Sequence, residues 1–320
     1  MLIVQSKSTD IYRNLAIEEW LLDHAEGRGE ILFLCVNSPC VVIGKNQNPW
    51  RECRLSLMKK EGVPLARRIS GGGAVYHDEG NLNVGLIVPR TEYREEKQYE
   101  LILKTLEKFG IKAAKLRENS LAVDGKKFSG QAFCFRGDRV LHHGTLLINS
   151  DLKRLGRYLG SEVEGIETKA VASVPAQVAN LSSFAPGLTV EALFAALIEQ
   201  FQIMYAPSEV TRPTVPGPDF VGWVTSPGGN LDFKGRKSSL SAEALAEEEL
   251  GVIHWNDQNI PEAELLPIIE KLSSNDWKLN HTPRFQVILN GQTLEVEKGR
   301  ITNFDGRLLF EEWMNPRLVK

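Results

Sequence analysis

Three consecutive glycines, Gly71 to Gly73, constrain the fold of this sequence more than any other feature. Glycine loses more backbone entropy on folding than any other residue, so such a run is kept where the backbone adopts positive φ or approaches another group closely. The run lies in PLARRISGGGAVYHDEGNLNVG, residues 64–85. Its N–H groups and the guanidinium groups of Arg67 and Arg68 suit a phosphate or a carboxylate. We therefore predict a phosphate-holding loop; the alternative is a tight hairpin turn with both arginines solvated at its edge.

Length and composition are those of an ordinary soluble protein. The chain has 320 residues, 42% of them hydrophobic and 25% charged, enough for about two domains. Its net charge of −3 gives no reason to expect a nucleic-acid partner. Four cysteines without a CxxC pair and six histidines without an HExxH motif argue against structural zinc. The sequence has no signal peptide and no apolar run near the ~18 residues of a membrane span, so we expect a cytoplasmic protein without a membrane partner.

Helices and strands are predicted throughout the chain. Apolar residues at helical spacing predict helices at about 10–25, 51–61, 93–109, 151–158, 190–205, 242–250 and 262–272. Short β-branched and aromatic runs predict strands at 3–5, 31–36, 41–43, 75–77, 81–88, 114–116 and 121–123. Hairpins are expected between 31–36 and 41–43, across 126–148, and across 285–304. The segment 207–218 holds four prolines and predicts a linker.

The second informative stretch is KKFSGQAFCFRGDRVLHHGTLLI, residues 126–148. Strand alternation predicts Lys127 and Ser129 on one face of the strand and Phe128 on the other. The returning strand should bring His142 or His143 near Lys127. A lysine facing a glycine loop suits adenylation of a carboxylate, because an ammonium and backbone N–H groups stabilise the charge that develops on the phosphoryl oxygens.

Four motifs in this order resemble the lipoate–protein ligases and lipoyltransferases, a branch of the superfamily that also contains the biotin protein ligases: NLAIEEW, KNQNPWREC, ARRISGGGAVYHDEGN, and KKFSGQAF with LHHGTLL. RRISGGG in place of a GRGRRGR-type loop favours lipoate over biotin. The resemblance implies an α+β fold, in which helices pack on the mixed sheet of a catalytic domain of the biotin/lipoate ligase type, with a small C-terminal α/β piece. The segments implied are a catalytic domain (1–205), a linker with an unmatched helical insertion (206–274) and a shortened C-terminal segment with a β-hairpin (275–320).

The resemblance also implies an ATP-dependent activity. Lipoate, ATP and Mg²⁺ would give lipoyl-AMP, and the lipoyl group would pass to a lysine of a lipoyl domain in an oxoacid dehydrogenase E2 subunit or the glycine cleavage H protein. Lys127 matches the family's essential lysine, and Lys126 should face solvent. The positions matched to ATP or the adenylate are Arg68, Gly71, Gly72, Gly73, Ala74, Val75, Tyr76, His77, Lys127 and His143. Those matched to lipoate are Glu18, Cys35, Ser70, Gly73, Lys127 and Ala132. Metal ligands are not identified.

Residue spacing alone leaves other interpretations open. Asn14 and Glu18, one helical turn apart, could be surface residues, and Cys35 could be an ordinary core thiol. Asn119-Ser120 stands where many relatives carry Asn-Asp, and the small C-terminal domain is shortened. The insertion or a separate accessory subunit could therefore assist adenylation, or the protein could be a lipoyl or octanoyl transferase that performs only the transfer.

Two further hypotheses differ in class. One is an acyltransferase that forms a thioester on Cys134, although its neighbours supply no base that would lower the pKa of the thiol. The other is a non-catalytic protein that binds lipoyl-adenylate or a lipoyl domain. Turnover by a Cys134→Ser variant tests the first, and intact-mass analysis after incubation with ATP, lipoate and a lipoyl domain tests the second.

Overall fold

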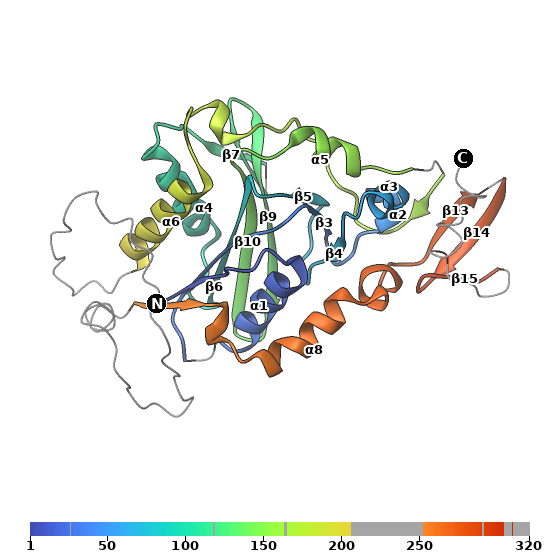
Figure 1. Ribbon diagram of the computed structural model, residues 1–320, viewed down its shortest axis with the longest axis horizontal. Helices are drawn as coiled ribbons and strands as arrows, with labels where there is room; N and C mark the ends of the chain where they lie inside the picture. Colours follow the sequence, from blue (N-terminus) through green and yellow to red (C-terminus); the bar gives the residue numbers. More distant parts are fainter. Residues whose placement is uncertain are drawn as a thin grey trace.

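The computed structural model describes residues 1–25, 27–117, 119–162, 165–205, 252–289, 291–303 and 309. Its centre is a mixed eight-stranded sheet with helices on both faces (Figure 1). In spatial order the strands are β12 (Ile253–Asn256), β1 (Leu2–Gln5), β2 (Ile31–Val36), β6 (Asn81–Pro89), β10 (Arg139–Leu147), β9 (Lys126–Arg136), β8 (Ser120–Val123) and β7 (Ala114–Arg117). β1 runs parallel to both of its neighbours, and the other neighbouring strands pair antiparallel. The α+β fold class predicted from the sequence is therefore confirmed.

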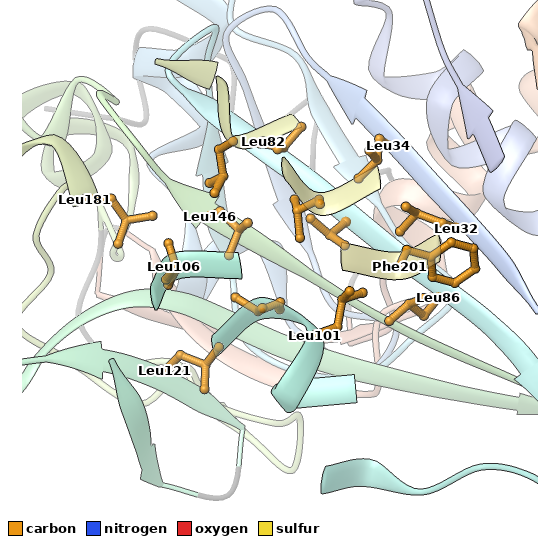
Figure 2. Packing of buried hydrophobic residues seen from close by; sticks show 14 of the residues in the cluster. Leu32, Leu34, Leu82, Leu86, Leu101, Leu106, Leu121, Leu146, Leu181 and Phe201 are labelled. Carbon is orange, nitrogen blue, oxygen red and sulfur yellow. The ribbon is translucent and has the colours of Figure 1, made fainter. Parts of the chain in front are cut away.

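One face of the sheet is covered by α4 (Glu95–Glu107) and α6 (Val190–Tyr205). The short helix η1 (Leu181–Ser183) precedes α6 in the chain, and its Leu181 belongs to the same buried cluster. Leucines from strands and helices interdigitate there in a buried cluster (Figure 2). The opposite face carries α1 (Ile11–Asp23) and α8 (Glu262–Ser273), which pack together through a second cluster. α1 starts at Asp10, whose carboxylate accepts the Arg13 N–H at 2.8 Å as an N-cap. This second face also carries the candidate site.

Two smaller sheets extend the molecule (Figure 1). The first consists of β4 (Leu65–Arg67), β3 (Cys40–Ile43) and β5 (Val75–His77). The second consists of β11 (Glu167–Thr168), β13 (Phe285–Leu289), β14 (Gln292–Glu297) and β15 (Arg300–Ile301). A third cluster joins both sheets to α2 (Pro49–Glu52), α3 (Leu55–Lys60) and α5 (Leu152–Tyr158). In it the rings of Trp50 and Phe285 lie 5.2 Å apart, so the hairpin of β13 and β14 packs on α2.

Most predicted elements are present, including the hairpins 126–148 and 285–304. The predicted hairpin of 31–36 with 41–43 is wrong, because β2 pairs with β1 and β6 whereas β3 pairs with β4 and β5. The segment between β2 and β3 leaves the large sheet at Ser38, whose N–H donates to the Thr9 carbonyl. The predicted helix 51–61 is interrupted at Cys53, which is extended and bridges to Leu159.

Val252 to Ser273 belongs to the large sheet and its helical layer, although it falls within the segment expected to be a linker and insertion. β12 extends the sheet at β1, η2 (Asp257–Asn259) follows, and α8 packs on α1. The predicted linker 207–218 and helix 242–250 lie outside the described residues. None of the described helices is long and apolar enough to cross a membrane.

Candidate active site

A cavity of about 950 Å³ lies on the α1 side of the large sheet. Its walls come from α1, from strands β2, β6, β9 and β10, from the glycine loop after β4, and from the β7–β8 edge. A strip without regular structure, residues 171–177, closes another side. The cavity therefore brings together the two stretches that the sequence singled out, 64–85 and 126–148.

Arg68 organises the glycine loop from inside the protein. Its guanidinium donates to the carbonyl of Gly71 (Nη2 at 2.6 Å, Nε at 3.0 Å) and to the carbonyl of Gly73 (Nη2 at 2.8 Å). Burial lowers the pKa of Arg68 to about 10, and the Glu18 carboxylate opposes that shift, so the group keeps its charge at neutral pH. Arg67 is also fully buried and donates to the carbonyls of Lys45 and Gln47. The alternative of two solvated arginines at a turn is therefore wrong.

The same arrangement leaves loop N–H groups available. A trans peptide points its N–H opposite its carbonyl, so the Gly72 N–H is directed away from Arg68. Among the described residues no acceptor binds the N–H groups of Gly72 and Gly73. The next N–H, of Ala74, donates to Ser173 Oγ at 2.9 Å. Gly72 has φ +88°, and a Cβ there would lie 2.7 Å from Arg68 Nη2, which explains why this position is glycine.

Lys127 faces this cavity because of a β-bulge. Leu121 pairs with Ser129 but Ala122 pairs with Lys127, so Phe128 is an extra residue on β9. The prediction that Lys127 and Ser129 share a face is therefore wrong. Lys127 lies over Gly130, where a Cβ would be 3.1 Å from Nζ. Its pKa is lowered from the ordinary value by burial and then by the charges of Arg68 and Arg117.

No ion pair or hydrogen bond holds the Lys127 ammonium within the described part of the chain. Its backbone is fixed instead: the N–H donates to Gln177 at 2.8 Å, and the carbonyl accepts the Ala179 N–H at 3.0 Å. Lys126 is exposed, as predicted. The site thus presents a cation whose backbone is fixed and for which the described residues supply no counterion.

Three side chains from distant segments form a chain of hydrogen bonds at the glycine loop. The Glu18 carboxylate lies 2.7 Å from His143 Nδ1, and His143 Nε2 lies 2.6 Å from Ser70 Oγ. In the neutral ring the Nδ1–H donates to Glu18, so Nε2 accepts the Ser70 hydroxyl. Glu18 lies over Gly85, where a Cβ would be 3.4 Å from Glu18 Oε1, an ordinary van der Waals contact. The second oxygen of Glu18 is buried without a hydrogen-bond partner.

Polar groups on β5 and α1 complete this end of the cavity. Asn37 Nδ2 donates to His77 Nδ1 at 3.1 Å, which leaves the His77 proton on Nε2, buried and without an acceptor among the described residues. Burial lowers the pKa of His77 to about 3, and the neighbouring Arg68 adds to the shift. Asn14 is buried and donates to Asn37 Oδ1 at 2.8 Å. The interpretation of Asn14 and Glu18 as surface residues is therefore wrong.

Most residues singled out from the sequence line the cavity: Glu18, Cys35, Arg68, Gly72, Gly73, Ala74, Val75, His77, Lys127, Ala132 and His143. Three do not. Tyr76 points to the opposite side of β5, where its ring lies 5.7 Å from that of Tyr158, and Ser70 and Gly71 belong to the loop segment but not to the cavity lining. His142, the other histidine predicted near Lys127, is turned into an aromatic cluster on the far face of the sheet.

Several lining residues were missed. They are Asn37, Asn83, Arg117, Thr145 and the strip 171–177. The strip has no motif or periodicity, although Ser173 also accepts from Gln47 Nε2 at 3.0 Å and so ties the loop to 45–53. Asn83 and Thr145 are paired across β6 and β10, so strand register was the only signal that could have joined them.

The cysteines are not arranged as nucleophiles. Cys134 does not line the cavity, and burial raises the pKa of its thiol. Cys35 does line it, but full burial and the Glu18 charge hold the pKa of its thiol well above the usual range. Neither thiol is poised to form a thiolate.

The described lining residues do not build a site for Mg²⁺. Hard cations require several oxygen ligands, yet Glu18 is the only acidic residue among the described lining residues, and His143 holds one of its oxygens. No group of three or more His, Cys, Asp or Glu in the described ranges could hold a metal. The side chains present therefore do not fit a resident magnesium ion.

Known proteins match the part of the chain that builds this cavity. A family model described as the lipoyl protein ligase A/B catalytic domain matches residues 10–202. A lipoate-protein ligase A of Bdellovibrio bacteriovorus is 42% identical over 205 residues, which cover 63% of this chain and 60% of that protein. Human mitochondrial lipoyl amidotransferase LIPT1 is 43% identical over 206 residues, which cover 62% of this chain and 55% of that protein. The chain thus spans about three fifths of the length of these curated relatives.

Solved structures agree in fold. The crystal structure of Plasmodium falciparum LipL1 in complex with lipoate has a TM-score of 0.66 at 29% identity, and the match covers 94% of this chain and 82% of that one. A lipoate-protein ligase A bound with ATP has a TM-score of 0.55 at 26% identity, covering 63% and 84%. The residues matched by the family model, 10–202, include the glycine loop and the strands β2, β6, β10, β9, β8 and β7 of the large sheet.

Proposed function

The chain belongs to the lipoyl protein ligase A/B catalytic-domain family, and from that premise we propose that it activates lipoate with ATP and transfers the lipoyl group to a lysine of a lipoyl domain. The observation that carries the proposal is the convergence of two features on one cavity. These are the Lys127 ammonium, which has no protein counterion in the described ranges, and the glycine-loop N–H groups, which lack acceptors there. Together they suit an acyl phosphate anhydride.

In the first step a carboxylate oxygen of lipoate attacks the α-phosphorus of ATP. The bond from that phosphorus to the bridging oxygen breaks, and pyrophosphate leaves with the electron pair. Lys127 and the Gly72 N–H stabilise the negative charge that develops on the α-phosphoryl oxygens. The described lining residues offer only one carboxylate, so any Mg²⁺ would be bound by the nucleotide rather than by the protein.

In the second step the amine of a lipoyl-domain lysine attacks the acyl carbonyl, AMP leaves, and the lysine loses a proton to solvent. Lys127 lies over Gly130 and can remain beside the carbonyl through both steps. The acyl chain would run toward Cys35 and Glu18, with the buried polar groups of α1 at its end. E2 lipoyl domains are candidate acceptors, because a bi-partite ligase of Thermoplasma acidophilum, at 26% identity and a TM-score of 0.55, is described together with its E2 lipoyl domain.

A second candidate function is transfer alone, from an acyl donor activated elsewhere. The 43% identity with a protein named lipoyl amidotransferase favours it, as does the lack of a carboxylate cluster for Mg²⁺ in the described ranges. The two functions share the second step and differ only in the first.

The deciding experiment gives the purified full chain either ATP with lipoate or chemically prepared lipoyl-AMP, together with a lipoyl domain. We expect pyrophosphate release in the first arm and a mass gain of one lipoyl group on the domain in both. Modification from lipoyl-AMP alone would replace the ligase by the transferase. No modification in either arm would leave a binding protein and refute both enzymatic functions.

A further inference from the structure

Arg117 is a cavity-lining cation to which the family motifs gave no role. It is the last residue of β7, is exposed, and has no hydrogen bond or ion pair with any described residue. Its neighbour on the strand, Lys115, has a partner: it contacts Glu95 on α4 at 2.7 Å and lies over the ring of Tyr99. The two basic residues of β7 therefore serve opposite faces of the sheet.

Strand register places Arg117 in one row with Lys127. Arg117 pairs with Ser120 across β7 and β8, and Ser120 pairs with Gly130 across β8 and β9. Paired residues of antiparallel strands project on the same face, and the Lys127 side chain covers Gly130. Ser120 lines the cavity between the two cations. With strands ~4.8 Å apart, the backbones at the two ends of the row are about 10 Å apart, a distance that two long side chains can share over one ligand.

The row results from a second β-bulge. Lys115 pairs with Leu121 but Arg117 pairs with Ser120, so Leu116 is an extra residue on β7. Without it, alternation would put Arg117 on the same face as Lys115. The bulge thus brings a second positive charge to the cavity, one without a partner among the described residues, at a cost in strand regularity.

The described residues place no carboxylate beside this row. Glu18 is the single acidic residue among the described lining residues, and it lies on α1, bound to His143 and close enough to Arg68 to oppose the shift in its pKa. Burial lowers the pKa of Lys127, and the positive charges of Arg68 and then Arg117 lower it further, because like charges repel. A bound polyanion would relieve this repulsion.

We propose that Arg117, with the Ser120 hydroxyl, binds the β- and γ-phosphates of a nucleoside triphosphate, so that the departing pyrophosphate leaves along the Arg117–Ser120–Lys127 row. This rests on the proposed function for the position of the α-phosphate at Lys127. It also explains how a cavity with one carboxylate neutralises a triphosphate, because a guanidinium fork binds phosphate oxygens without a metal ion. A chain that only transferred a ready-made adenylate would have no use for this row.

Calorimetric titration of pyrophosphate, ATP and AMP into the full chain tests the subsite without requiring activity. For Arg117→Gln we expect the dissociation constants of pyrophosphate and ATP to rise about tenfold or more, the loss typical of one charge-assisted contact, while that of AMP changes less than about twofold. Lys115→Gln is the matched control, since it removes an equal charge from the same strand on the opposite face. It should change all three constants less than about twofold.

If Arg117→Gln weakened the binding of AMP as much as that of ATP, the effect would be a general electrostatic one and the subsite would be overturned. The same holds if Lys115→Gln weakened pyrophosphate and ATP binding as much as Arg117→Gln does. Lack of pyrophosphate and ATP binding by the wild type would also overturn it. Failure of the proposed function gives a different result. A wild type that binds pyrophosphate through Arg117 but never modifies a lipoyl domain would disprove the ligase and keep the subsite.

Discussion

Replacement of Lys127 by methionine should remove most of the adenylation activity and leave the fold intact. Methionine keeps an unbranched apolar stem over Gly130, where the lysine lies now, so the change removes the ammonium and little packing. The backbone bonds of Lys127 to Gln177 and Ala179 do not depend on the side chain. The variant therefore tests the charge of the Lys127 side chain separately from its packing and from the backbone hydrogen bonds.

The size of the effect follows from the position of the ammonium. Two unit charges ~4 Å apart at an effective dielectric constant of ~20 interact by about 4 kcal/mol. Lys127 is only partly buried, so solvent screening reduces this figure to about 3 kcal/mol. Since 1.36 kcal/mol corresponds to a factor of ten in rate, we expect kcat for pyrophosphate release to fall roughly 10²- to 10³-fold.

The assay is pyrophosphate release from ATP in the presence of lipoate, with Lys126→Met as the matched control. Lys126 is exposed and one residue away, so its removal changes the net charge equally without touching the cavity. The melting temperature of Lys127→Met should not fall, because the ammonium has no partner to lose within the described residues. Near wild-type release by Lys127→Met, or an equal loss in Lys126→Met, would show that the argument from this ammonium is wrong.

Three further predictions concern the loop, the thioester alternative and pH. Gly72→Ala should reduce adenylate formation more than tenfold, because φ is +88° and the Cβ would lie 2.7 Å from Arg68 Nη2; Gly71→Ala, where nothing lies within 4 Å, should stay near wild type. Cys134→Ser should keep its turnover in the lipoylation assay, and a large loss would revive the thioester mechanism. Burial lowers the pKa of His142 to about 3 from 6.5, so the unfolded chain takes up the proton first and stability falls with pH below 6.5. In His142→Phe, the free energy of unfolding, measured with denaturant, should fall less steeply as the pH drops below 6.5, by up to about 1.4 kcal/mol per pH unit. An unchanged slope of unfolding free energy against pH would disprove this effect of His142.

The elements of the sheet could be predicted because their signals are local. Alternating β-branched residues, the Asp124-Gly125 turn and the Asp10 cap each determine structure within a few residues. Pairing of distant strands could not be predicted in this way. β2 and β3 are adjacent in sequence and look like a hairpin, yet tertiary packing assigns them to different sheets. β12 joins β1 across some 250 residues, and no local pattern in either strand indicates the other.

The same distinction between local signals and tertiary arrangement applies to the candidate site. Motif matching found the loop and the lysine, and it also matched Arg68, which lines the cavity, to the nucleotide. The structure places Arg68 beneath the loop, where it binds carbonyls and so directs N–H groups away from itself. Its role could not be predicted from residue type, because a guanidinium that binds an anion and one that orients a loop have the same sequence signature. Burial distinguishes them, and burial is a tertiary property.

The two β-bulges show why strand alternation did not predict which face of the sheet carries the residues of the site. Perfect alternation on β9 would place Lys127 with Ser129 on the face packed by α4 and α6, where an ammonium would be buried among leucines. One inserted residue on β9 turns Lys127 to the cavity, and one on β7 does the same for Arg117. A bulge costs a ladder hydrogen bond and some regularity, so two on neighbouring strand pairs require compensation. A polyanion bound between the two cations would provide it, and that makes the irregular edge of the sheet part of the site.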